Sequence, residues 1–113
     1  MASRATKATN EQLKAVVGLK KMLLERYPDI PQYTIHSLAA YIEKHKPTGL
    51  FLGAVLSNNF IGAIFNAGTS NLKAIRNIAR LVHREVPYRA YGSQGKVASW
   101  IKNKESQKES QEG

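Results

Sequence analysis

The chain carries no charged side chain between residues 47 and 72, although 22% of all residues are charged. Two apolar runs, residues 50–56 and 60–65, fill most of this segment, and Ser57, Asn58 and Asn59 separate them. The segment is long enough to span a bilayer. Three polar side chains at its centre would lack hydrogen-bond partners in lipid, however. We therefore expect no membrane span and assign the segment to the interior of a globular domain.

The sequence allows two structural interpretations of this segment. The first is a pair of short helices joined at Ser57-Asn58-Asn59. The second is a β-hairpin that turns at Asn58-Asn59, because short apolar runs do not distinguish helix from strand. We favour the helix pair.

Helical signals come before the uncharged segment. Thr9 and Gln12 match a capping box that opens a helix ending near Arg26, before Tyr27-Pro28. A second helix begins between Pro31 and Thr34 and is stopped by Pro47-Thr48-Gly49, and four of its apolar side chains repeat at helical spacing. They are Ile35, Leu38, Ala39 and Ile42.

Two further helices are expected after the uncharged segment. One begins at Thr69 or Ser70 as its N-cap and continues to Pro87. Ser93 can cap the last helix, whose apolar side chains are Val97, Trp100 and Ile101.

These signals predict a single all-α domain, a bundle of four to six short helices spanning residues 9–102. We expect a disordered lead-in at residues 1–8 and a disordered charged tail at residues 103–113. The tail contains no apolar side chain and repeats the sequence Lys-Glu-Ser-Gln. The uncharged segment should supply the centre of the core. The expected core residues are Phe51, Leu52, Val55, Leu56, Phe60, Ile64 and Phe65.

The formal net charge of +9 is unevenly distributed. Residues 73–101 contain six basic side chains and only Glu85 as an acid, whereas the tail from residue 102 is neutral. The basic excess therefore belongs to the folded part of the chain, which favours a polyanionic partner.

Four basic side chains share one side of the helix expected at residues 69–86. At about 100° per residue, they fall within about 80° of one another, on one stripe roughly 12 Å long. Arginine binds phosphate well because its donors form a rigid fork. The stripe consists of Lys73, Arg76, Arg80 and Arg84. A solvated face whose arginines pair with Glu11, Glu25, Asp29 or Glu43 is the competing interpretation.

The segment after this helix extends the candidate nucleic-acid site to Arg89, Tyr91 and Lys96. Tyrosines beside arginine can stack on bases, and the glycine-rich turn could donate backbone N–H groups to phosphate. Alternatively, the tyrosines pack on Trp100. Gly95-Lys96 lacks the spacing of a P-loop, which argues against nucleotide hydrolysis. A helix-turn-helix formed by residues 60–66, Gly68 and residues 71–86 is a further alternative.

Catalytic and metal-binding signals are weak. The chain has no cysteine, and its three histidines form no i, i+4 pair. We therefore predict no enzymatic activity, no catalytic or metal-binding residues and no cofactor. The absence of cysteine and of an apolar leader fits a cytoplasmic protein.

One pattern resembles a known group of proteins. The residues from Pro47 to Asn58 read P-x-G-x-F-L-x-A-V-L-x-N, and those from Gly92 to Trp100 read G-S-x-x-x-V-x-x-W. This pattern is similar to that of small phage- and prophage-encoded helical proteins of unknown function. Asn59 and Gly68 stand where such proteins tend to carry acidic residues. The resemblance implies a short helical fold and a bacterial host cytoplasm, without a mechanism.

Two functional hypotheses follow. The leading one is a non-enzymatic accessory protein that binds DNA or RNA through the basic helix face, largely independently of sequence. The alternative is an inhibitor or adaptor that uses the same basic surface against an acidic host protein. The sequence leaves the oligomeric state open.

Overall fold

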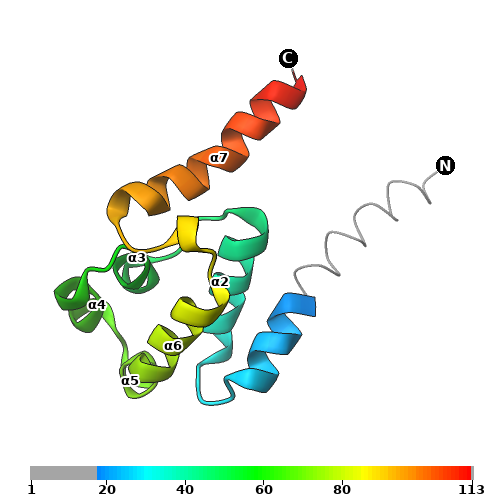
Figure 1. Ribbon diagram of the computed structural model, residues 1–113. Helices are drawn as coiled ribbons and strands as arrows, with labels where there is room; N and C mark the ends of the chain where they lie inside the picture. The colour runs from blue at the N-terminus through cyan, green and yellow to red at the C-terminus, as the bar shows by residue number, and fades with distance from the viewer. Residues whose placement is uncertain (1–17, 113) are drawn as a thin grey trace.

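The computed structural model describes residues 18–112, with side chains described through Asn103. The lead-in at residues 1–8 and the capping box at Thr9 and Gln12 lie outside the described part. A helical segment at residues 18–26 precedes α2. Then follow α2 (Gln32–Lys44), α3 (Leu50–Leu56), α4 (Phe60–Asn66), α5 (Thr69–Lys73), α6 (Ile75–Glu85), the 3₁₀ turn η1 (Tyr88–Ala90) and α7 (Gln94–Glu112), as shown in Figure 1.

The all-α fold is confirmed over the described residues, but the number of helices exceeds our expectation. The helix predicted from residue 69 to 86 is broken at Ala74, which has φ −98° and ψ 8°. The Ala74 N–H donates to the carbonyls of Ser70 and Asn71 at 3.3 and 3.1 Å, which tightens the end of α5. Because α5 lies between α4 and α6, the continuous second helix of the proposed helix-turn-helix does not form.

The uncharged segment forms the helix pair, not the hairpin. Asn58 is left-handed at φ 62°, and its N–H donates to Val55 while the Asn59 N–H donates to Ala54. These two bonds form a Schellman motif that ends α3. The Asn59 side chain then caps α4 by accepting from the Gly62 N–H at 2.9 Å. The two asparagines thus end one helix and start the next.

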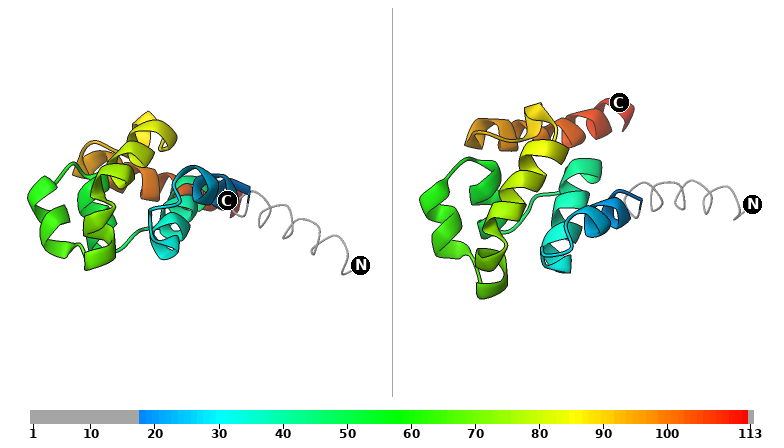
Figure 2. Two further views of the ribbon diagram at one scale, coloured as in Figure 1. Left: turned by 90° about the horizontal axis from the view of Figure 1, so that it is seen from below. Right: turned by 60° about the horizontal axis from the view of Figure 1, so that its bottom comes forward.

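Most of the core lies between α2, α3 and α6. Ile35, Leu38, Ile78 and Leu81 are fully buried, and Leu23 joins them from the segment 18–26. Figure 2 places α3 and α4 at one end of the molecule and the segment 18–26 at the other, with α6 between them.

The prediction of the core is wrong for two residues. Phe60 and Phe65, both on α4, are 70% and 84% exposed, whereas Phe51, Leu52 and Leu56 on α3 are buried as expected. Val55 and Ile64 are half-buried. Ala63 is the one buried residue of α4, whereas Phe60, Ile61 and Phe65 are exposed.

A set of polar contacts attaches α7 and η1 to the end of α2. The Trp100 indole N–H donates to the Tyr41 carbonyl at 2.7 Å, and the Trp100 ring stacks on His45 at 3.9 Å between centroids. His45 Nδ1 lies 2.7 Å from the Trp100 carbonyl, so Nδ1 carries a proton, since a carbonyl only accepts. The buried Tyr41 hydroxyl donates to the Ala90 carbonyl at 2.7 Å. These bonds satisfy polar groups that would otherwise be costly to bury.

The last helix, α7, begins at the N-cap that the sequence predicts. The Ser93 hydroxyl accepts from the Lys96 N–H at 3.1 Å, so Ser93 is the predicted N-cap. The helix continues to Glu112, across the residues for which the sequence predicts a disordered tail. The boundaries of the domain and its tail stay predictions.

No helix among residues 18–112 combines the length and the apolar character that crossing a bilayer requires.

The left-handed backbone at Asn58 predicts the outcome of two substitutions. Asn58→Val should lower the free energy of unfolding by about 1–2 kcal/mol, because a β-branched residue is strained in this conformation. Asn58→Gly, which also removes the amide, should leave stability nearly unchanged. Urea denaturation of both variants tests this, and equal losses would contradict the Schellman motif as the cause.

Burial raises the pKa of Tyr41 to about 12, from an ordinary value near 10. Tyr41 therefore stabilises the fold fully below pH 10, and this stabilisation is lost as the pH rises through 12. The loss should reach up to about 3 kcal/mol. Urea denaturation between pH 9 and 12 should show a steeper decline in wild type than in Tyr41→Phe. Parallel declines would contradict the role of Tyr41.

Candidate nucleic-acid interface

Three arginines form a continuous exposed face on α6. Arg76, Arg80 and Arg84 are all exposed, whereas Ile78, Leu81 and Val82 on the other side of the helix are at most 4% exposed. The i, i+4, i+8 spacing sets successive arginines about 6 Å apart along the helix axis. We call these three residues the arginine face.

The expected alternative, in which acidic residues neutralise this face, can be examined for the described side chains. Among them, the one ion pair joins Arg26 to Glu85 at 3.1 Å. Glu25, Asp29 and Glu43 form no ion pair with the arginine face within the same set of residues, although Asp29 lines a cleft together with Arg80 and Arg84. Arg80 instead approaches Asn77 Oδ1 at 3.5 Å. Glu11 lies outside the described residues.

A cleft of about 520 Å³ lies beside the arginine face, between the end of the segment 18–26 and α6. Two members of the arginine face, Arg80 and Arg84, line it, and Arg26 adds a third guanidinium from the other side. The remaining lining residues are Tyr27, Pro28, Asp29, Asn77 and Glu85. Basic side chains therefore outnumber acidic ones in this cleft by three to two.

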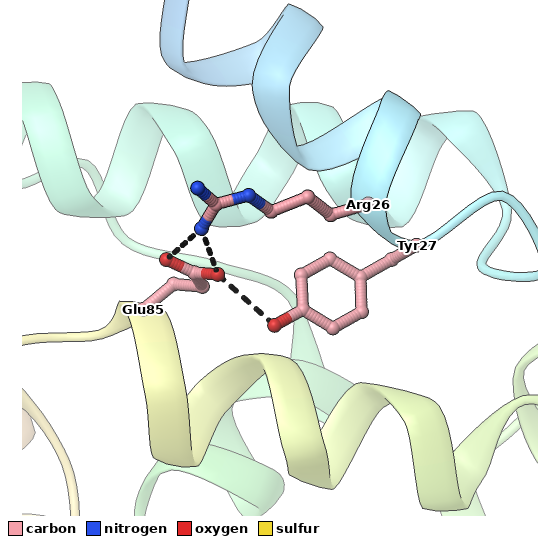
Figure 3. Close-up of polar contacts among 3 residues, drawn as sticks. All are labelled: Arg26, Tyr27 and Glu85. Atoms are coloured by element: carbon pink, nitrogen blue, oxygen red, sulfur yellow. Dashed lines mark hydrogen bonds and ion pairs between the residues drawn. The ribbon is translucent and has the colours of Figure 1, made fainter.

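Three of the residues that line the cleft form a polar cluster, which Figure 3 shows. Arg26 donates to both carboxylate oxygens of Glu85, at 3.1 and 3.5 Å, and the Tyr27 hydroxyl donates to Glu85 at 3.0 Å. The Glu85 side chain is 13% exposed and that of Arg26 is 59% exposed. Burial, together with the neighbouring Glu85, raises the pKa of Tyr27, and Arg84 opposes this. The tyrosine thus remains a neutral donor.

Sequence reasoning did not include Arg26 among the site residues. Arg26 meets Glu85 across 59 positions of the chain. No local pattern indicates such a contact, because it depends on how the segment 18–26 packs beside α6. Glu85 stood out in the sequence as the single acid of residues 73–101.

Lys73 is separated from the arginine face by the helix break. It is the last residue of α5, whereas the three arginines lie on α6. Its side chain is exposed. The common helical stripe predicted for all four residues therefore holds only for the arginines, because Ala74 interrupts the helix that would align Lys73 with them.

The other three predicted residues lie near the end of α6 or beyond it. Tyr91 lies close to α6, since its hydroxyl is 3.3 Å from His83 Nδ1. Arg89 is exposed on η1. The Lys96 ammonium lies 3.9 Å from the centroid of the Tyr88 ring, a cation–π contact.

Two backbone N–H groups of the glycine-rich turn are already bonded within the protein. The Gly92 N–H donates to the Leu56 carbonyl at 2.8 Å, and the Lys96 N–H donates to Ser93. Neither has a free proton for a phosphate. The side chain stacked on Trp100 is His45, rather than one of the tyrosines of this turn.

The histidines have separate environments. His45 contacts Trp100, His83 contacts Tyr91, and His36 is exposed on α2. Within residues 18–112, no three histidine or acidic side chains gather in a way that could hold a metal ion.

Comparisons with known proteins do not assign the chain. No protein-family model matches it, and neither a curated protein nor a solved structure does.

The cluster around Glu85 predicts a difference between two variants. Glu85→Ala leaves the Tyr27 hydroxyl without its acceptor, which should cost about 1–3 kcal/mol of unfolding free energy. Glu85→Gln keeps an acceptor oxygen and removes only the charge facing the exposed Arg26, so it should cost less than about 1 kcal/mol. Urea denaturation measures both, and a loss in Glu85→Gln as large as in Glu85→Ala would show that the charge dominates.

Proposed function

We propose that this chain is a non-enzymatic accessory protein, of the phage-encoded kind that its sequence resembles, which binds the nucleic-acid backbone. The observation that carries the proposal is the arginine face. Three guanidinium groups lie exposed in one line on a rigid helix, and no described acidic side chain pairs with them. Like charges in such a row repel one another, and a polyanion removes that cost.

The ligand that best fits this face is a row of phosphates. Arginine offers several donors in a planar fork and is therefore suited to bidentate phosphate contacts. A line of guanidinium groups at regular spacing fits a ligand with repeating phosphates better than it fits a single compact anion. Arg26, at the edge of the cleft, adds a fourth guanidinium beside Arg80 and Arg84.

We expect binding to depend little on base sequence. The basic side chains are distributed along α6, whereas a recognition helix contacts bases mainly through its N-terminal residues. Phosphate contacts position a protein but carry no sequence information. Lys73 would extend the contact at one end, and Arg89 and Tyr91 at the other. Lys96 would contribute less, because its ammonium is held over Tyr88.

The test is a fluorescence-anisotropy titration of labelled single- and double-stranded oligonucleotides at several salt concentrations. Changing Arg76, Arg80 and Arg84 together to Ala removes three phosphate contacts. On duplex DNA the slope of log affinity against log salt should become shallower by about 2.7, and affinity near 0.1 M salt should fall more than about tenfold.

A matched control removes the same charge elsewhere. Lys44 is the last residue of α2, Lys46 lies just after it, and Lys102 lies on α7, so all three are outside the arginine face. Changing these three to Ala should reduce affinity much less. Equal losses of affinity in the two triple variants would contradict the proposal, because they would show that only the net charge of the protein matters. Absence of oligonucleotide binding by the wild-type protein would overturn it in favour of an acidic protein partner.

A further inference from the structure

One side of α4 exposes large apolar side chains, although the sequence predicts this segment to lie in the core. Ile61 and Phe65, four positions apart, are 62% and 84% exposed, and Phe60 beside them is 70% exposed. Their helix lies at the end of the molecule opposite the segment 18–26, as the two views of Figure 2 show. We call Ile61 and Phe65 the ridge. Contiguous exposed apolar side chains of this size are uncommon on monomeric proteins and mark interaction sites.

A groove of about 770 Å³ runs along one side of α4, between α3 and α7. Small residues line much of it, among them Gly53, Ala54, Gly62 and Ala98. Leu50, which is 79% exposed, stands at its edge. No charged side chain belongs to the lining of this groove. Small residues leave room for a large side chain to enter.

We propose that a second copy of this chain occupies this surface, with the ridge of each protomer seated in the groove of the other. Both elements involve α4, since the ridge lies on this helix and Gly62 and Asn66 of the same helix line the groove. A two-fold axis brings a ridge to each groove when each protomer supplies both, which is the geometry of an isologous dimer.

Electrostatics favours this occupant over an acidic protein partner. The chain carries +9 overall, so two copies repel one another wherever basic surfaces meet. The ridge comes from the uncharged segment, and no charged side chain lines the groove. This surface therefore lets two copies approach without apposing charges. An acidic partner would gain more by binding the arginine face.

The available area is consistent with a weak dimer. An aromatic side chain buries about 200 Å² when fully covered. At its exposure, Phe65 alone presents roughly 170 Å² of the about 800 Å² that each partner contributes to an interface of standard size. Ile61, Leu50 and the groove walls add to this. Aromatic side chains at an uncharged centre are also the composition typical of interface cores.

The experiment is sedimentation equilibrium of the full chain between about 1 and 100 µM. We expect a monomer at the low end and a dimer at the high end, as for an interface near the lower size limit. Phe65→Asp should weaken the dimer at least about tenfold, since it removes a central aromatic anchor and buries a charge. Circular dichroism should show unchanged helix content, because Phe65 is exposed in the monomer.

Two further variants make the test specific. Tyr33→Asp changes an aromatic side chain that is 61% exposed on α2, and it should leave the dimer intact. Ala98→Trp fills the groove without altering the ridge, and it should weaken the dimer as Phe65→Asp does. A wild-type monomer at 100 µM would overturn the proposal, as would a dimer that neither Phe65→Asp nor Ala98→Trp affects. Oligonucleotide binding of Phe65→Asp, measured at monomeric concentrations, separates this proposal from that of the arginine face.

Discussion

The burial of one side of α6 is the constraint on which the rest of the structure depends. Ile78, Leu81 and Val82 pack into the core between α2 and α3, and this packing fixes the rotation of the helix about its axis. Once that rotation is set, Arg76, Arg80 and Arg84 must face solvent. The hydrophobic contacts contribute the stability, and the arginines, which repel one another, are tolerated because they cost a few tenths of a kcal/mol per pair.

A second set of contacts holds the C-terminal part of the fold to this core. The side chains of Tyr41 and Trp100 each donate a hydrogen bond to a backbone carbonyl from a distant part of the chain. The His45 ring stacks on the Trp100 ring. Each hydrogen bond satisfies a group that burial would otherwise penalise. Because α7 forms one wall of the groove beside α4, these contacts also shape the surface proposed for dimerisation. The two proposed surfaces therefore depend on different parts of one core.

Much of the fold was predictable from local signals. Asn58 and Asn59 indicated the joint between two short helices, Ser93 indicated the start of α7, and prolines marked the ends of α6 and of the segment before α2. The signals succeeded because they act within a few residues through backbone geometry. The break at Ala74 was not predictable in this way. The apolar spacing from Leu72 to Val86 continues across it, so periodicity alone indicated one helix.

The sequence by itself determined that this protein is helical, that its basic excess lies in the folded part, and that three arginines share one side of one helix. Helical periodicity and capping chemistry are local, so a linear pattern suffices for them. Tertiary structure alone decided that Arg26 meets Glu85 beside those arginines, and that Phe60 and Phe65 remain exposed although they are as apolar as the buried α3 residues. An apolar side chain is buried only when a neighbouring element covers it. Which element covers which face depends on contacts between residues far apart in the chain, and these leave no local pattern.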